Sequence, residues 1–274
     1  MKKEIYEKFE SLAAFTAALD SRPMAEWATE YKASTDRSPK MTKKCTTSSY
    51  QEANRLLLNG DKENAKKLVN AKKHHSVNIL SVRRQNSVYN APVGFTPNIP
   101  AYLTGTPNSM LNIHQTPKKN SKVITLVINC AASWQTLKEE IISFGTNVVS
   151  LIQLLEAKGY RLNLYASSIC YFEVSGKNKG LLLVKIKDAG KPLNVTNITY
   201  PLVNPSFLRR HVFAWVERQK NVDNYGYVLT EKKECIKMVQ AYIERALILT
   251  EWNDCNKTID ELLKELEKQA KTAF

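Results

Sequence analysis

Four side chains that could make specific contacts follow directly on an apolar run at residues 123–128. They are Asn129, Ser133, Trp134 and Thr136. In open α/β sheets the ligand site lies at the carboxyl ends of the parallel strands, and an apolar run of this kind is typical of such a strand. We therefore predict that these four residues form a binding face for a protein partner, through shape and hydrogen bonds.

Two residues of this stretch also have structural interpretations. Cys130 has no histidine nearby in the sequence to activate its thiol, which favours a small core residue over a nucleophile. Ser133 stands shortly before an expected helix, where serine is a common N-terminal cap. Neither residue is predicted to be catalytic.

Basic residues concentrate in residues 37–84. Twelve lysines or arginines there stand against three acidic residues, which leaves +9 in this segment of a chain whose net charge is +14. Such a segment attracts polyanions without identifying them. The residues predicted to contact a polyanion, two of them from a later helix, are Lys62, Lys66, Lys67, Lys72, Lys73, Arg83, Arg84, Arg209 and Arg210. The alternatives are a solvated basic face and, for one of the two later arginines, an internal ion pair such as one with Glu217.

Carboxylates that could serve hydrolysis are scattered along the chain. Glu173, Asp188, Asp223 and Asp254 fall near expected strand ends or in loops, and nothing favours one of them over another. The sequence contains no glycine-rich phosphate-binding motif, zinc-protease motif or nucleophile elbow. We predict no catalytic residues. A divergent hydrolase that uses these carboxylates is kept as a hypothesis after protein binding and nucleic-acid binding.

The elements that must position these residues alternate between strand and helix from residue 122 onward. Thr136 and Glu139 form a capping-box pattern that predicts a buried helix up to about residue 157, in which Gly145 suggests a close approach to the sheet. Residues 161–174 read as a second strand, parallel to the first. The next strand follows after a short turn, so it should be antiparallel.

Further elements complete this part of the chain. Helices are predicted at about 205–219 and 231–244, and a strand at 241–250. Thr258 and Glu261 form another capping-box pattern at the start of a final helix. The expected architecture is a three-layer α/β fold at residues 121–274.

The first third of the chain is predicted to be an N-terminal helical region, residues 1–84. Apolar residues recur at helical spacing in residues 3–18. Ser49 and Glu52 form a capping box for a second helix, and Asp61 can cap a third.

Residues 85–120 differ in composition from both neighbours. They contain five prolines and no acidic residue. We interpret them as an extended connector whose aromatic and aliphatic side chains pack along a surface.

The pattern around Asn129 resembles the von Willebrand factor A-type fold. In that family a first strand ends in Asp-x-Ser-x-Ser and is followed by a buried helix, a parallel second strand and a short antiparallel third strand. The resemblance implies an A-domain-like, broadly Rossmann-like sheet. The family's Asp and two Ser residues help to hold a divalent cation, which requires oxygen ligands. Here these positions are Asn129, Ala131 and Ser133, so the resemblance implies a degenerate metal site with no bound metal and no cofactor.

A narrower resemblance points to tailed phages. Residues 94–110, 129–134, 151–165 and 204–217 resemble pieces of an uncharacterised family of phage and prophage proteins, in which the strand end often reads Asp-Val-Ser-Ala-Ser-Trp. This resemblance implies an origin in a phage or mobile element and no activity.

Composition and cysteine usage indicate the setting of the protein. No apolar run approaches the roughly 20 residues that span a bilayer, and the N-terminal residues lack the apolar core of a signal peptide. The five cysteines are scattered and never spaced as CxxC, which favours a reducing cytoplasm, that of the host if the protein is phage-encoded. We predict a non-enzymatic protein-binding or scaffolding protein without membrane contact, and alternatively a nucleic-acid-binding protein that uses residues 37–84.

Overall fold

The computed structural model describes residues 4–31, 34, 43–69, 86–115, 123–172, 178–220, 222 and 224–273. The chain divides into two units, one formed by Met1–Val77 with Val123–Phe274 and the other by Asn78–Lys122. None of the described helices is both long and apolar enough to cross a membrane.

The first unit is an α/β fold built on a six-stranded mixed sheet. Its strand order is β1-β7-β6-β5-β9, and β8 pairs with β6. The strands are β1 (Glu4–Phe9), β5 (Val123–Asn129), β6 (Arg161–Tyr171), β7 (Lys179–Lys187), β8 (Tyr227–Val228) and β9 (Leu247–Thr250). β5 runs parallel to both of its neighbours, β6 and β9, whereas β7 is antiparallel to β6. The predicted apolar first strand, parallel second strand and antiparallel third strand are confirmed.

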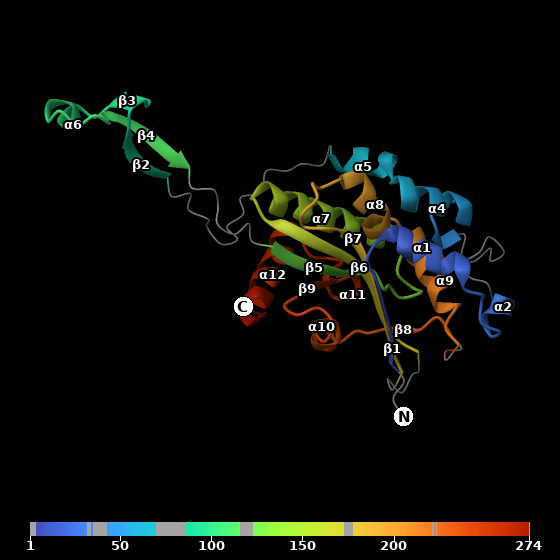
Figure 1. Ribbon diagram of the computed structural model, residues 1–274. Coiled ribbons are helices and arrows are strands. Elements are labelled where there is room, and N and C mark those ends of the chain that lie inside the picture. Colours follow the sequence, from blue (N-terminus) through green and yellow to red (C-terminus); the bar gives the residue numbers. More distant parts are fainter. Residues whose placement is uncertain are drawn as a thin grey trace. The chain divides into compact units, whose positions relative to one another are not determined.

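Helices cover both faces of this sheet (Figure 1). α7 and α8 lie on one face, while buried side chains of α10 pack with β5, β6 and β7 on the other. The helices of this unit are α1 (Leu12–Ser21), α2 (Ala28–Tyr31), α4 (Tyr50–Asn59), α5 (Lys62–Val69), α7 (Lys138–Ala157), α8 (Val195–Val203), the π-helix η1 (Phe207–Val212), α9 (Phe213–Val216), α10 (Lys232–Gln240), α11 (Glu251–Asp254) and α12 (Ile259–Ala273).

The prediction of an N-terminal helical region at residues 1–84 is wrong, because the first described residues belong to the sheet. Glu4–Phe9 forms β1, which pairs with β7 in parallel, and the first helix starts only after Ser11, whose hydroxyl accepts a hydrogen bond from the N–H of Ala14 (3.0 Å). The ring of Tyr6 stacks on that of Tyr242 at 3.6 Å between centroids. This pairing with residues distant in sequence outweighs the helical spacing of the apolar residues.

Two predicted caps in the same segment are confirmed, with one difference. The Ser49 hydroxyl accepts a hydrogen bond from the N–H of Glu52 (3.0 Å), and Asp61 accepts one from the N–H of Asn64 (3.0 Å). The carboxylate of Glu52, however, accepts from the N–H of Ser48 (2.7 Å), one residue before the cap.

The N-cap of α7 is Leu137, one residue beyond the predicted cap Thr136. Glu140, not Glu139, reaches back and accepts a hydrogen bond from the N–H of Leu137 (2.8 Å). Thr136 is therefore part of the preceding turn. At the final helix the prediction holds, because Glu261 accepts from the N–H of Thr258 (2.8 Å) and Thr258 accepts from that of Glu261 (3.4 Å).

Two further elements differ from the prediction. The strand expected at 241–250 is confined to Leu247–Thr250, and turns occupy most of the residues before it. The helix expected at 205–219 is present as η1 followed by α9, and α8 precedes it, with Pro201 inside. The prolines at 201 and 205 obscured α8 in the sequence, because proline usually ends a helix.

The second unit is a small antiparallel sheet where an extended connector was expected. Its order is β2-β4-β3. The strands are β2 (Asn86–Ala91), β3 (Thr96–Pro97) and β4 (Met110–Gln115), and α6 (Ile99–Leu103) follows β3.

Gly145 in α7 marks a close approach, but to α8 rather than to the sheet. A Cβ atom on Gly145 would lie 2.1 Å from the carbonyl oxygen of Leu202 and 2.6 Å from the Cα of Val203. Backbone atoms cannot move away as a flexible side chain can, so the contact requires glycine.

We expect the substitution Gly145→Ala to lower the free energy of unfolding by about 3 kcal/mol, the upper part of the range for overpacked cores. By helix propensity alone, alanine would raise the free energy of unfolding by about 1 kcal/mol. A decrease therefore indicates the clash with α8. Urea unfolding followed by circular dichroism measures it, with the exposed Ser143→Ala in the same helix as control. A Gly145→Ala protein as stable as the control would contradict the α7–α8 contact.

Candidate functional site

The candidate site lies at the carboxyl ends of the parallel strands β5 and β9, which stop level with Ser167 of the longer strand β6. Asn129 is in register with Ser167 of β6 and with Thr250 of β9. The N–H of Cys130 donates to the carbonyl of Ser167 (2.8 Å), which continues the pairing one residue beyond β5. Residues 129–137, which lead from β5 into α7, are called the β5 loop below.

Asn129 shapes the β5 loop from within. Its side-chain oxygen accepts hydrogen bonds from the N–H groups of Ala131 (3.2 Å) and Ile169 (3.0 Å). These bonds fix the amide, and within the described part of the chain its Nδ2 has no hydrogen-bond partner. Asn129 is only 1% exposed, so its predicted direct contact with a partner is wrong and its role is positional.

Two cations hold consecutive carbonyl groups of the β5 loop. The buried Arg209 donates from Nη2 to the carbonyl of Ser133 (2.8 Å), and Lys44 donates to the carbonyl of Trp134 (2.7 Å). The Lys44 nitrogen lies 5.3 Å from the centroid of the Trp134 ring, and the Arg209 Cζ lies 5.7 Å from it and 5.5 Å from that of Phe213. All three contacts are within the range of cation–π attraction.

Trp134 is the member of the predicted face that solvent reaches most freely. Its side chain is 47% exposed, while Ser133 and Thr136 are half-buried. The Ser133 hydroxyl accepts from the N–H of Gln135 (3.3 Å) inside the turn, so it does not cap α7 as the sequence suggested. The structure thus brings Ser133, Trp134 and Thr136 together on one short loop.

Glu251, which the sequence analysis missed, is buried at the same end of the sheet. It follows directly on Thr250, and within the described residues its Oε2 has no hydrogen-bond partner. Burial raises the pKa of Glu251 to about 7; nearby Glu140 raises this pKa further and Arg209 opposes the rise. A glutamate near a strand end gave no signal in the sequence, because its burial depends on the packing of α7 and η1.

The thiol of Cys130 is not activated. Burial raises the pKa of Cys130 to about 12, so the thiol stays protonated at neutral pH. Its sulfur lies 3.5 Å from the carbonyl oxygen of Pro201. These contacts agree with a packing role.

The positions that the A-type resemblance assigns to metal ligands do not fit a divalent cation. The Asn129 oxygen is taken by two N–H donors, and the remaining atom of that amide is itself a donor. Ala131 has no side-chain oxygen, and the Ser133 hydroxyl is engaged with Gln135. Among the described residues there is no cluster of three or more His, Cys, Asp or Glu side chains suited to a metal.

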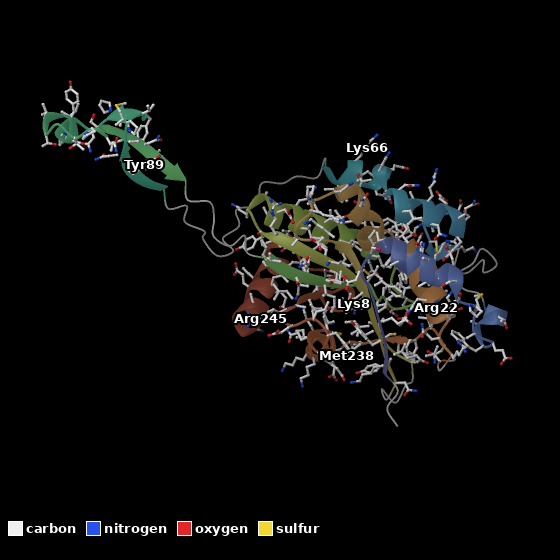
Figure 2. All side chains as sticks on the ribbon, viewed as in Figure 1. Lys8, Arg22, Lys66, Tyr89, Met238 and Arg245 are labelled. Carbon is white, nitrogen blue, oxygen red and sulfur yellow. The ribbon has the colours of Figure 1, made fainter. Side chains whose placement is uncertain are left out.

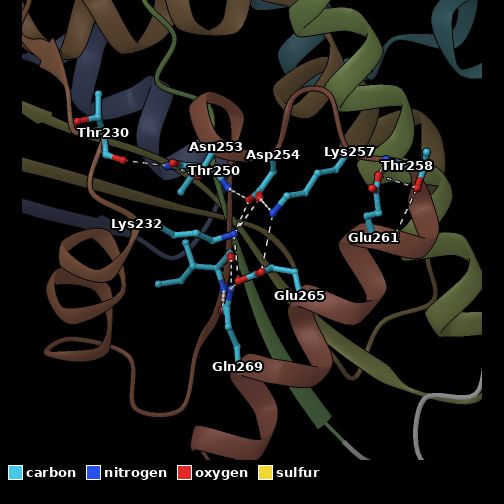
Figure 3. A network of polar contacts seen from close by, with 11 residues as sticks. Thr230, Lys232, Thr250, Asn253, Asp254, Lys257, Thr258, Glu261, Glu265 and Gln269 are labelled. Carbon is cyan, nitrogen blue, oxygen red and sulfur yellow. Dashed lines mark hydrogen bonds and ion pairs between the residues drawn. The ribbon is translucent and has the colours of Figure 1, made fainter.

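The short helix α11, which begins with Glu251, is fixed by an ion-pair network around Asp254 (Figure 3). The fully buried Asp254 carboxylate binds the amines of Lys232 (2.8 Å) and Lys257 (2.7 Å) and accepts a hydrogen bond from the N–H of Thr250 (2.9 Å). Glu265 of α12 joins the same network through Lys232 (3.2 Å). Asp254 is thus structural.

The two described carboxylates of the hydrolase hypothesis, Asp188 and Asp254, do not meet. Asp188 follows β7, whose last residue, Lys187, pairs with Leu164 in the first half of β6. Asp188 therefore lies toward the opposite edge of the sheet from Asp254. Glu173 and Asp223 lie outside the described residues.

The basic residues predicted to contact a polyanion fall into three groups, which lie on α5, in η1 and outside the described residues. Lys62, Lys66 and Lys67 are exposed on α5, and Figure 2 shows Lys66 on the outer side of that helix. Lys62 and Lys67, together with Arg55, line a cavity of about 600 Å³ beside α4, but acidic residues line it as well. Four residues lie outside the described part of the chain: Lys72, Lys73, Arg83 and Arg84.

The prediction that Arg209 and Arg210 bind a polyanion is wrong, because both side chains are buried, at 2% and 1% exposure. Arg210 donates to the hydroxyl of Thr47 (3.1 Å) and to the carbonyls of Thr47 (3.3 Å) and Ser34 (3.4 Å). Glu217 accepts from the N–H of Ser34 (2.9 Å) and from the hydroxyl of Tyr225 (2.8 Å). These arginines join segments of the protein to each other.

Comparison with family models gives one match, to a domain of unknown function named DUF7192, over residues 2–271. The chain belongs to the DUF7192 family. The matched range includes residues of both units. Comparisons with curated proteins and with solved structures find no match. DUF7192 carries no assigned activity, and none of these comparisons supports the phage origin or an A-type metal site.

We expect Glu251 to make stability depend on pH. A folded-state pKa of about 7 against an ordinary value of 4.5 means that the folded chain keeps a proton which the unfolded chain releases. This contribution to stability is complete below about pH 4.5, declines as the pH rises and is lost above pH 7, by about 3 kcal/mol in all. The variant Glu251→Gln should therefore gain stability relative to wild type between pH 5 and pH 8.

Chemical denaturation at a series of pH values measures this difference, with the exposed Glu244→Gln as control. Equal pH dependence of wild type and Glu251→Gln would show that the carboxyl group ionises normally in the folded protein.

Proposed function

We propose that the chain is a non-enzymatic protein-binding protein whose contact face is the β5 loop. The observation that carries the proposal is the setting of Trp134, a half-exposed ring whose backbone carbonyl and π face are both held by Lys44. Tryptophan is enriched at the energetic centres of protein interfaces, where a large ring is buried on binding. A ring that is already held in place loses little conformational entropy when a partner covers it.

The surroundings of Trp134 complete a small apolar face with polar flanks. Leu137, at the end of the β5 loop, is 57% exposed. Thr136 lies between the two apolar side chains in sequence, Ser133 directly precedes Trp134, and both are half-buried. Asn129 and Arg209 support this face from beneath through the hydrogen bonds described above.

The charge of the chain favours an acidic partner. A net charge of +14 attracts negatively charged surfaces and raises the rate at which they are encountered. We therefore propose a partner segment that combines an apolar side chain for the Trp134 face with carboxylates.

Three finer points belong to the same proposal. The sheet is taken as A-domain-like because a parallel β6, an antiparallel β7 and a polar loop follow β5 in the expected order. All five cysteines are free thiols, which agrees with a reducing cytoplasm. A phage or mobile-element origin rests on the short sequence stretches alone.

The binding face can be tested by selection from a random peptide display library on the immobilised full chain. We expect selected peptides to be rich in Asp and Glu and to carry an aromatic or aliphatic residue. The substitution Trp134→Ala should weaken their binding at least about tenfold, as the loss of an interface centre does. The control is Tyr227→Ala, which removes another half-exposed ring, on β8. Failure to enrich any peptide, or equal binding by both variants, would contradict the proposal.

A second candidate function, nucleic-acid binding, is favoured by the three exposed lysines of α5. Lys62, Lys66 and Lys67 lie within two turns of one helix, and of these Lys67 makes an exposed ion pair with Glu63 at 3.5 Å. An exposed pair of this kind contributes little and is readily exchanged for a phosphate. Base edges are not read by such an arrangement, so the binding would be independent of sequence.

Titration of duplex DNA and of single-stranded RNA at several salt concentrations tests this second function. If the three lysines each neutralise a phosphate, their joint replacement by Gln should reduce the slope of log K against log salt on duplex DNA by about 2.7. The control replaces three exposed lysines on other elements, Lys220, Lys233 and Lys264, by Gln. No binding at about 50 mM salt, or equal slopes for both triple variants, would exclude α5 as a nucleic-acid surface.

A further inference from the structure

The described residues of the second unit, 86–115, are free of charge in a strongly charged chain, whereas Arg83, Arg84, Lys118, Lys119 and Lys122 flank them within the same unit. Residues 86–115 contain no Lys, Arg, Asp or Glu, although the whole sequence has 40 basic and 26 acidic residues. The net charge of +14 therefore resides entirely in the remainder of the chain. Such neutrality over 30 consecutive residues is unusual for an exposed surface, which normally carries charge for solubility.

The same unit exposes much of its apolar surface. Of the large apolar side chains that are exposed in the described part of the chain, eight belong to it, including Tyr89 (Figure 2). The eight are Val88, Tyr89, Val93, Phe95, Ile99, Tyr102, Leu103 and Ile113. Ala91 is the one buried residue among those of the unit whose exposure is described.

The Val88 face of the small sheet is left open by the described residues of its own unit. Val88 pairs with Ile113 across β2 and β4, and both are more than 40% exposed. The other face is more enclosed: Tyr89 points to it at 44% exposure, but Ala91 on the same face is only 7% exposed. A sheet of this size is stabilised by the burial of apolar surface, and the Val88 face can bury more of it against a partner.

The outer edge of β2 is open within the described residues. β2 lies at one end of the strand order and pairs there only with β4. Natural proteins protect such edges with charged residues, proline or short strands. β3, at the other end, is two residues long and contains Pro97, whereas β2 has six residues with no charge and no proline.

We propose that the second unit docks with the same unit of a second copy of this chain, through antiparallel pairing of the two β2 strands about a twofold axis. The two three-stranded sheets would then form one continuous sheet, with apolar cross-strand contacts around Val88 and Tyr89. A twofold arrangement places the same surface on both sides, so every contact occurs twice.

Charge favours a second copy as the occupant of this edge. Two chains of net charge +14 repel each other through their basic surfaces, and residues 86–115 are a neutral stretch through which they can meet. An oppositely charged partner would gain nothing from a surface without charge. A lipid bilayer is a poor occupant, because the unpaired N–H and C=O groups of the β2 edge cannot be satisfied in hydrocarbon.

Sedimentation of the full chain over a range of concentrations tests the proposal. Wild type should be a dimer in the micromolar range, and Val88→Lys should weaken dimerisation at least tenfold because it places a charge on each β2 edge. The matched control is Leu58→Lys, which makes the same change at an equally exposed position on α4. Added salt should leave the dimer unchanged or tighten it, since screening reduces the repulsion between the basic surfaces.

Hydrogen exchange of wild type gives a second readout that needs no variant. The backbone amides of Asn86–Ala91 should exchange more slowly as the protein concentration rises through the dimerisation range. A monomer at all concentrations, a dimer that Val88→Lys and Leu58→Lys affect equally, or binding of the chain to neutral phosphatidylcholine vesicles in place of dimerisation would each overturn the proposal.

Discussion

Two adjacent buried guanidinium groups constrain how the first unit folds. Arg209 and Arg210 are consecutive residues of the π-helix η1, and both side chains are almost completely buried. A buried cation destabilises the folded state unless oxygens accept its hydrogen bonds. Arg209 requires the carbonyl of Ser133, and Arg210 requires oxygens of Ser34 and Thr47. The N-terminal segment and the β5 loop must therefore both be in place when this core forms, which is why the loop is held firmly enough to present a large ring.

Two carboxylates three residues apart show how strongly the surroundings decide the chemistry of a buried acid. Asp254 is paired with two lysines and a backbone N–H, so its charge is compensated. Glu251 has an oxygen without a hydrogen-bond partner among the described residues, and burial raises its pKa to about 7. Cys130 and His211 both stay uncharged at neutral pH, because burial raises the pKa of Cys130 to about 12 and lowers that of His211 to about 3.

Local and long-range determinants explain which features the sequence revealed. β5 and β7 were predictable because each contains a continuous apolar run, and β6 because it follows the turn at Gly159 that ends α7. The caps at Ser49 and Thr258 were predictable because they are hydrogen bonds within four residues. β1 was misread because its apolar residues also fit a helical period, and only its pairing with β7 decides the matter. The burial of Arg209 and Glu251 depends on partners far away in sequence, so no local pattern could reveal the most unusual part of the candidate site.

The two proposed surfaces act on different parts of the chain and reinforce each other. The β5 loop belongs to the first unit, whereas self-association uses residues of the second, so pairing of two chains occupies no residue of the Trp134 face. A dimer then carries two such faces. When a partner offers two acidic segments, binding of the second becomes intramolecular, and the gain in overall affinity is about 10²–10⁴ if the geometry allows both contacts. A shallow face centred on one tryptophan binds a partner weakly by itself. The positive charge of the chain keeps copies apart, so an uncharged pairing surface would be the feature that joins two such faces.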